Sequence, residues 1–453
     1  MKFHGKNFAF SEVIQKVIEK IVNYIPRKQD ADLIKQILKT NSCSKKNLTE
    51  KKLTEVLKVA YKYVPFYRQY DFLKNVSKKN CFEMLEKLPL SDKEFIFKNE
   101  KNLRHKKMFH EDYQYWSSTG GSTGKPLLFP KSYIPEGEHQ IALIEYITGE
   151  SFADILSKPY GIVSFDGTRP AEEDMKKNIF WDEQSKGIYG NLFFCSFYET
   201  EENLKYYVEK LNEAKPVLIR GYSNAILTCA KYINKYHTLK SFPKAVYVTS
   251  EYCAKESMLE ISQAFNCPVY GQYGLSEAAF FGWTKPNDDI YYLSPIYGYA
   301  EILNENGKHV KPGEKGELTA TAFGNYVQPF IRYRTGDIVE FGGYENGILK
   351  LSGLKGRAKE FVYDDDMTKI PLVGFFDIHY MSIKDKVIQF QLEQKVKGEV
   401  ICRLIVRDDW KKTDEKEIKE LLAKKNIRVS FEYPKEIPLT QSGKMKMIIQ
   451  NLK

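Results

Sequence analysis

Short apolar runs alternate with amphipathic stretches between about residues 115 and 350, and few folds accommodate this pattern. The runs YGIVSFDG, PVLIRGYS, KAVYVTSE and CPVYGQYG are typical of buried strands, and each ends in small or polar residues. ENLKYYVEKLNEA and NAILTCAKYINKY have the spacing of amphipathic helices. Strands that alternate with helices predict a mainly parallel sheet with both faces covered. Such sheets bind ligands at the carboxyl ends of their strands, so we expect the polar residues there to share one site.

The segments on either side of this region have a different character. Residues 1–110 are predicted to be mostly helical, with one helix beginning after Pro89 and Ser91 as its N-cap. Beyond the segment GELTATAF the chain is rich in strands as far as Arg357. The remainder contains two strand-like runs, a helical stretch DEKEIKELLAKKN and a further strand, which suffices for a small α+β domain.

The predicted fold class is therefore α/β with two domains. Residues 1–357 would form a large N-terminal domain, with mainly parallel sheets flanked by helices plus a β-rich subdomain. Residues 358–453 would form the small C-terminal domain, and the boundary falls between Arg357 and Glu360. A chain of 453 residues is too long for one simple core, which supports this division.

Charge and cysteine usage argue against several classes of function. The net charge of +10 comes from 69 basic and 59 acidic side chains without a basic block, which favours small anionic ligands such as nucleotides over nucleic acid. The seven cysteines form no Cys-x-x-Cys pair, so we expect no zinc site or disulfide framework, and a reducing cytoplasm. Residues 13–25 form a predicted amphipathic helix that is too polar for a signal peptide or a membrane span. We expect it to pack on the body of the protein.

Residues 117–124 are all serine, threonine or glycine, and Lys125 follows them. A Walker A loop needs glycine where Thr119 stands and serine or threonine where Pro126 stands, so this stretch is not that motif. Glycines nevertheless let backbone N–H groups turn toward an anion, and hydroxyl groups add donors around it. The stretch is thus either a phosphate-binding loop or an ordinary polar loop, and other motifs must decide between them.

Five short motifs occur in an order that is far more specific than any one of them. They are STGGSTGKP, YGLSE, YRTGD, GRAKEF and PLTQSGK. In this order and rough spacing they resemble the adenylate-forming superfamily of acyl-coenzyme A ligases, peptide-synthetase adenylation domains and luciferases. YVPFYRQYDFLKN, LEKLPLSDKEFIFKN and KPVLIRGYSNAIL further resemble the phenylacetate–coenzyme A ligase branch, including its capsule-biosynthesis relatives. The resemblance covers nearly the whole chain from about residue 50 onward.

The resemblance implies an ATP- and Mg²⁺-dependent enzyme that joins AMP to a carboxylic acid and releases pyrophosphate. The Ser/Thr/Gly loop would hold the β- and γ-phosphates, with Lys125 either beside them or merely solvated. The loop residues are Ser118, Thr119, Gly120, Gly121, Ser122, Thr123 and Gly124. Gly120 stands where the superfamily usually has serine, which we expect to loosen the loop.

Two further motifs are expected to surround the nucleotide. Glu277 matches the superfamily's magnesium ligand, Ser276 the hydroxyl that meets the α-phosphate, and Tyr273 the aromatic ring that lies against adenine. Asp337 would accept the ribose hydroxyls, and Arg357 would add a ribose or phosphate contact. The alternatives are a packed core tyrosine at 273, surface charges at 277 and 357, and an Asx turn at 337.

Lys359 and Lys444 match the moving parts of the superfamily. Lys359 would be the hinge about which a mobile C-terminal domain swings between the two half-reactions. Lys444 would bridge the substrate carboxylate and the nucleotide in the transition state, although on composition alone it would be an ordinary solvated lysine. Lys125, Glu277 and Lys444 are thus the candidate catalytic residues.

The acid and the acceptor are less well defined by the resemblance. Tyr222, Ser250 and Gly271 are candidates for lining the acid pocket, and the many aromatic residues favour an aryl or other apolar acid. Tyr363 replaces a second lysine of some thioester-forming members, and Lys446 replaces a frequent arginine. We expect the acceptor to be a separate molecule: coenzyme A, a carrier protein or an amine. An amide-forming ligase and a non-catalytic nucleotide-binding protein are the alternatives, and the resemblance allows a homodimer.

Overall fold

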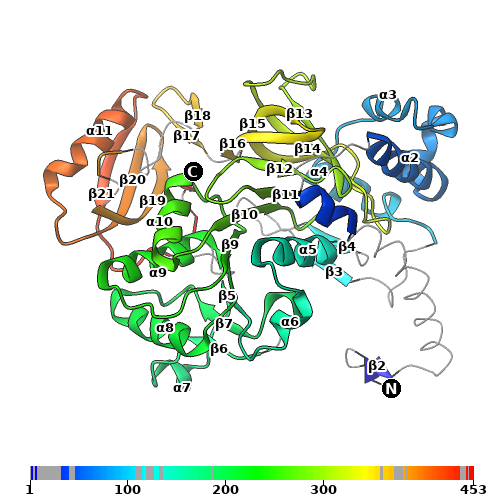
Figure 1. Ribbon diagram of the computed structural model, residues 1–453. Helices are drawn as coiled ribbons and strands as arrows, with labels where there is room; N and C mark the ends of the chain where they lie inside the picture. Colours follow the sequence, from blue (N-terminus) through cyan, green and yellow to red (C-terminus); the bar gives the residue numbers. More distant parts are fainter. Residues whose placement is uncertain are drawn as a thin grey trace.

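The fold is described from a computed structural model (Figure 1). The residues that it describes are 2–3, 6–7, 32–39, 46–107, 115–118, 127–131, 136–184, 187–357, 361–371, 381–383, 386–438, 445–446 and 448–452. The predicted amphipathic helix over residues 13–25 lies outside these ranges. Within the described part of the chain, every helix is too short or too polar to cross a lipid bilayer.

Five parallel strands form the centre of a 12-stranded sheet, in the order β7-β5-β8-β9-β10. These strands are β5 (Ile162–Asp166), β7 (Leu192–Cys195), β8 (Leu218–Tyr222), β9 (Ala245–Thr249) and β10 (Val269–Gly274). The crossover helices are α8 (Glu201–Ala214), α9 (Ser223–Tyr236) and α10 (Lys255–Phe265). The alternation of strands and helices in the sequence therefore predicted the fold class correctly.

Both faces of the parallel strands are buried, and neighbouring residues along each strand point to opposite faces. Val163 and Ile219 pack against the face covered by α8, α9 and α10. Ile162 and Leu218 pack against the other face, which the helical residues 32–39 and one longer helix cover. That longer helix is α5 (Glu136–Thr148). Burial on both sides explains why these strands are near-continuous apolar runs rather than alternating ones.

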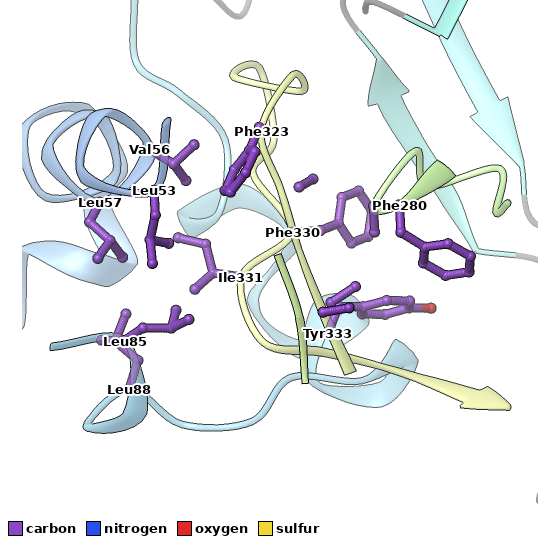
Figure 2. Close-up of a cluster of buried hydrophobic side chains, with 14 of the residues drawn as sticks. Leu53, Val56, Leu57, Leu85, Leu88, Phe280, Phe323, Phe330, Ile331 and Tyr333 are labelled. Carbon is purple, nitrogen blue, oxygen red and sulfur yellow. The ribbon is translucent and has the colours of Figure 1, made fainter. Parts of the chain in front are cut away.

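Beyond β10 the sheet continues in antiparallel order as β10-β11-β12-β16-β15-β14-β13. The added strands are β11 (Phe281–Thr284), β12 (Tyr291–Leu293), β13 (Gly298–Leu303), β14 (Lys315–Ala322), β15 (Tyr333–Glu345) and β16 (Ile348–Arg357). Figure 2 shows one core in which Leu53 and Leu57 from the N-terminal helices pack with Phe330 and Ile331 from the β-rich region. The helical lead-in is thus part of the large body.

Helices and 3₁₀ turns follow one another in the N-terminal region. They are α2 (Lys46–Tyr63), η1 (Pro65–Gln69), η2 (Asp71–Asn75), α3 (Cys81–Glu86), α4 (Lys93–Asn99) and η3 (Glu100–Asn102). Asp92 caps α4, because its Oδ1 accepts a hydrogen bond from the backbone N–H of Phe95 at 2.8 Å.

Ser91 is not that cap, so the sequence-based prediction was wrong by one residue. The backbone N–H of Ser91 donates to the carbonyl of Arg332 at 3.0 Å, and its own carbonyl accepts from Arg334 N–H at 2.8 Å. Its Oγ donates to the carbonyl of Ile331 at 2.9 Å. Ser91 is therefore held as an extra bridge beside the start of β15, which is where the YRTGD motif begins.

The C-terminal part of the chain has a sheet of its own, in the order β21-β20-β19-β22. Its elements are β19 (Val387–Val396), β20 (Glu399–Val406), α11 (Glu415–Ala423), β21 (Arg428–Glu432) and β22 (Ile448–Gln450). The predicted succession of two strands, a helix and a strand is confirmed. Val400, Leu404 and Ile418 form part of its separate core. The exact division of the chain after residue 357 stays a prediction.

The remaining elements are short. They are β1 (Lys2–Phe3), β2 (Lys6–Asn7), β3 (Tyr115–Ser118), β4 (Leu128–Lys131), α6 (Phe152–Leu156), α7 (Glu172–Met175), β6 (Trp181–Asp182), η4 (Gly187–Tyr189), β17 (Phe361–Tyr363), β18 (Lys369–Pro371) and η7 (Lys412–Asp414). Of these, β3 and β4 matter most for function, because they pair antiparallel on either side of the Ser/Thr/Gly stretch.

Candidate active site

The YGLSE motif forms the end of β10 and the turn that follows it. Gly274 pairs with Phe281, so the chain reverses sharply between β10 and β11. Ala278 closes this turn with a positive φ of 53° and an N–H bond to the carbonyl of Leu275 at 2.9 Å. Ser276 is exposed in the turn, whereas Glu277 is only 5% exposed. The turn thus buries the carboxylate whose role as a metal ligand is a prediction from the resemblance.

Two tyrosine–carboxylate hydrogen bonds join the YGLSE and YRTGD segments reciprocally. Tyr273 Oη donates to Asp337 Oδ2 at 2.5 Å, and Tyr333 Oη donates to Glu277 Oε1 at 2.8 Å. Each segment therefore contributes one tyrosine and, four residues later, one carboxylate. Burial, and then the charge of Glu277, raises the pKa of Tyr333 above its usual value, so Tyr333 stays a neutral donor. The structure brings these two motifs into contact although the bonded pairs lie 64 and 56 residues apart in the chain.

Asp337 lies in β15 and is 8% exposed. Its backbone N–H donates to Thr335 Oγ1 at 3.0 Å, and that hydroxyl donates to the carbonyl of Leu318 at 2.8 Å. Thr335 thus links the backbone of Asp337 to that of Leu318 in β14. Across the ladder Asp337 pairs with Arg357 of β16, which places the backbone of Arg357 directly beside it.

Tyr273 is half-buried and packs against two rings. Its ring centroid lies 4.6 Å from that of Phe280 and 5.6 Å from that of Tyr291. This packing accounts for one part of the ring, while the partial exposure leaves another part accessible. The adenine contact predicted for Tyr273 therefore stays a prediction, and core packing is already part of its role.

The hairpin that bears the Ser/Thr/Gly stretch is anchored to the same cluster. Ser118 pairs with Leu128 across β3 and β4, and the loop residues 119–125, including Lys125, lie outside the described residues. Phe129 of β4 is fully buried, with its ring 5.1 Å from that of Phe330. The ring of Phe330 lies 5.1 Å from Tyr333, the donor to Glu277. The strand that follows the loop is thus packed onto the strand that fixes Glu277.

The three candidates for the acid pocket lie along the parallel strands. Tyr222 ends β8, and burial raises its pKa to about 12, with the charges of Asp166 and Glu251 adding to the shift. Ser250 follows β9, is exposed and has a φ of 72°. Gly271 is buried within β10, and a Cβ there would lie 2.8 Å from Tyr291 Oη. A ligand could therefore meet Gly271 only through its backbone, and a pocket lined by these residues stays a prediction.

Sequence reasoning missed Tyr333, Glu199 and Glu251. Tyr333 is the first letter of YRTGD, but its bond to Glu277 joins residues 56 positions apart, and no local pattern displays such a contact. Glu199 follows β7, and its Oε1 is buried without a hydrogen-bond partner among the described residues. Burial, and then the charge of Glu251, raises the pKa of Glu199 well above its usual range. The polar end of KAVYVTSE was the one signal that could have marked Glu251.

The other predicted site residues fall outside the described side chains. Lys359, Lys444 and the loop residues from Thr119 to Lys125 lie outside the described residues, and Ser118 and Arg357 are placed by their backbones alone. Their predicted roles stay predictions.

The central parallel sheet with its antiparallel extension, followed by a small four-stranded domain, is the fold of the adenylate-forming ligases. A crystal structure of 2-hydroxyisobutyryl-CoA ligase in the postadenylation state aligns with a TM-score of 0.61 at 15% identity, over 89% of this chain and 88% of that one. The acyl acid amido synthetase AtGH3.15, in complex with 2,4-DB, aligns with a TM-score of 0.56 at 13% identity, over 89% of each chain.

The sequence itself is similar to Protein CapK of Staphylococcus aureus. The two are 26% identical over 452 residues, which covers 98% of this chain and 89% of CapK. Residues 362–451 match the family described as the CapK C-terminal domain. The resemblance to the adenylate-forming superfamily, including its capsule-biosynthesis relatives, is thereby confirmed.

Proposed function

We propose that this chain is an ATP-dependent carboxylic acid ligase. It forms an acyl-adenylate with release of pyrophosphate and then transfers the acyl group, as a thioester, to coenzyme A. The observation that carries the proposal is the reciprocal pair of bonds from Tyr273 to Asp337 and from Tyr333 to Glu277. These bonds bring together the carboxylate predicted for the ribose and the carboxylate predicted for the metal.

Glu277 fits the chemistry that magnesium requires. Mg²⁺ prefers carboxylate oxygen and commonly takes one or two carboxylates from the protein, with phosphate and water completing its ligands. A single protein carboxylate beside a nucleotide is therefore enough to hold this ion. When bound, the ion would offset the charge of the phosphates as pyrophosphate leaves.

Each remaining residue has a defined task in the proposal. Asp337 accepts the ribose hydroxyls, and Tyr273, already bonded to it, places its ring beside the same nucleoside. The loop from Ser118 to Gly124 and Lys125 hold the β- and γ-phosphates. Lys444 stabilises the negative charge as the carboxylate oxygen of the acid bonds to the α-phosphorus and the bond to pyrophosphate breaks.

An amine acceptor is the second candidate for the transfer step. The chain has the fold of an acyl acid amido synthetase, and Tyr363 replaces a lysine found in some thioester-forming relatives. The backbone N–H of Tyr363 donates to Gln394 Oε1, and its carbonyl accepts from Gln394 Nε2, both at 2.7 Å. With the correct acid, coenzyme A accelerates AMP release if it is the acceptor and leaves AMP release unchanged if an amine is. The similarity to CapK points to capsule biosynthesis as the setting.

ATP–pyrophosphate exchange across a panel of carboxylic acids, beginning with aryl acids, tests the first step without knowledge of the acceptor. At least one acid should support exchange. Lys444→Ala should then reduce it by roughly 100-fold, which corresponds to about 3 kcal/mol of transition-state stabilisation. Lys424→Ala, at the exposed end of α11, is the matched control and should leave exchange unchanged. A non-catalytic nucleotide-binding protein would show no exchange with any acid.

A further inference from the structure

Helix α9 presents a row of polar residues to the C-terminal sheet, with its members spaced so that they share one face of the helix. Lys231 Nζ donates to the backbone carbonyls of Val387 and Ile388, at 3.1 and 3.4 Å. Gln389 Nε2 donates to Thr228 Oγ1 at 3.4 Å. Val387, Ile388 and Gln389, which make these bonds, are consecutive residues at the start of β19. This strand lies beside α9 in Figure 1.

Near the amino end of α9, Asn224 binds Glu251, and Glu251 in turn binds Met445. The backbone N–H and the Nδ2 of Asn224 both donate to Glu251 Oε2 at 3.1 Å. The other carboxylate oxygen, Oε1, accepts the backbone N–H of Met445 at 3.0 Å. Tyr222 at the N-cap of α9 makes no side-chain capping bond. Glu251 instead accepts the backbone N–H of Asn224 in the first turn. Its negative charge also lies favourably at the helix N-terminus.

Gln391, in the C-terminal sheet, also binds residues 445–446. Gln391 Nε2 donates to the carbonyl of Lys446 at 2.9 Å. Gln391 is 0% exposed, and its Oε1 accepts from Arg403 Nη1 at 3.0 Å, which fixes the orientation of its amide. Residues 445 and 446 are thus hydrogen-bonded to the large domain through Glu251 and to the small domain through Gln391.

We propose that Asn224, Thr228, Lys231 and Glu251 form a docking row that holds the small domain in the orientation used for adenylation. The inference rests on the proposed function, since its importance comes from Lys444, the residue before Met445. Consecutive Cα atoms are about 3.8 Å apart, so a fixed Met445 limits where Lys444 can reach. The four residues are positioning residues and do not touch the reacting atoms.

The character of the contacts suits a surface that docks reversibly. The hydrogen bonds made by Lys231 and Glu251 go to backbone groups of the small domain. When the two surfaces separate, these donors and acceptors can bond to water instead. A small domain that swings between half-reactions requires an interface of this kind.

Hydrogen–deuterium exchange of the full-length protein tests the docking without any substrate. In Lys231→Met and Glu251→Ala, peptides that cover residues 445–452 should exchange about tenfold faster than in the parent protein, which corresponds to ~1.4 kcal/mol of lost docking. Lys255→Met is the matched control, since Lys255 pairs with Asp288 inside the large domain. It should leave these peptides unchanged. Unchanged exchange in both Lys231→Met and Glu251→Ala would overturn the proposal.

Activity then separates positioning from general stability. With an acid that supports ATP–pyrophosphate exchange, Lys231→Met should lower the exchange rate about tenfold while Tm and transfer from preformed acyl-adenylate stay unchanged. Glu251→Gln, which keeps one acceptor oxygen, should recover part of the rate lost in Glu251→Ala. Equal losses in both half-reactions would indicate a merely structural role and contradict the proposal. If no acid supports exchange in the parent protein, the proposed function fails, while the deuterium result still decides whether the row docks the small domain.

Discussion

Tyr333→Phe tests the hydrogen bond from Tyr333 to Glu277, on which the proposed nucleotide site depends. The substitution removes the Oη that donates to Glu277 at 2.8 Å and keeps the ring, which packs 5.1 Å from Phe330. Glu277 is 5% exposed, so water cannot easily replace the lost donor. A hydrogen bond to a charged group contributes about 1.5–3 kcal/mol, so the large domain should unfold more readily by that amount. If the same bond orients Glu277 for the metal, ATP binding should need about 10- to 100-fold more Mg²⁺.

Two measurements on purified protein check this prediction: denaturant unfolding, and ATP binding by calorimetry over a series of Mg²⁺ concentrations. The control is Tyr433→Phe, because Tyr433 Oη donates to Glu415 Oε1 at 2.7 Å and Glu415 is 4% exposed. It removes the same kind of bond in the C-terminal domain and should leave the Mg²⁺ dependence unchanged. If Tyr333→Phe matches the parent protein in both measurements, the hydrogen bond does not organise the site.

Three other changes follow from the structure. Asp337→Asn keeps the shape but loses the charge, so it should raise the KM for ATP by at least about tenfold, and an unchanged KM would remove Asp337 from the ribose site. Gly271→Ala would place a Cβ 2.8 Å from Tyr291 Oη, so chemical denaturation should show a loss of about 1–3 kcal/mol. Burial raises the pKa of Cys195 to about 11 and of Cys267 to about 12, and the other cysteines among the described residues are also buried. No more than one of the seven thiols should therefore react rapidly with Ellman's reagent at pH 8, and rapid reaction of two or more would contradict this packing.

The parallel half of the fold could be predicted because its signals are local. Strands buried on both faces are continuous apolar runs, and α8 and α9 have a clear apolar stripe, so periodicity identified both. Ser91 shows the limit of this reasoning. Either Ser91 or Asp92 could cap a helix, and the choice depends on Ser91 pairing with Arg332 and Arg334, which lie more than 200 residues further along the chain.

The candidate site was predictable as motifs but not as contacts. Tyr273, Glu277 and Asp337 were found because each belongs to a short motif. That Tyr273 bonds to Asp337, and Glu277 to Tyr333, depends on the tertiary arrangement, because these partners lie 64 and 56 residues apart in the chain. Glu251 belongs to no such motif, and its importance appears only when Asn224 and Met445 are seen to share its carboxylate.

A crystal structure of the protein with Mg²⁺ and a non-hydrolysable ATP analogue tests the central claim most directly. The account predicts a nucleotide whose ribose hydroxyls lie within hydrogen-bond distance of the Asp337 carboxylate, with the metal bound to Glu277 and to phosphate oxygens. A nucleotide bound elsewhere, or one that touches neither carboxylate, would contradict it.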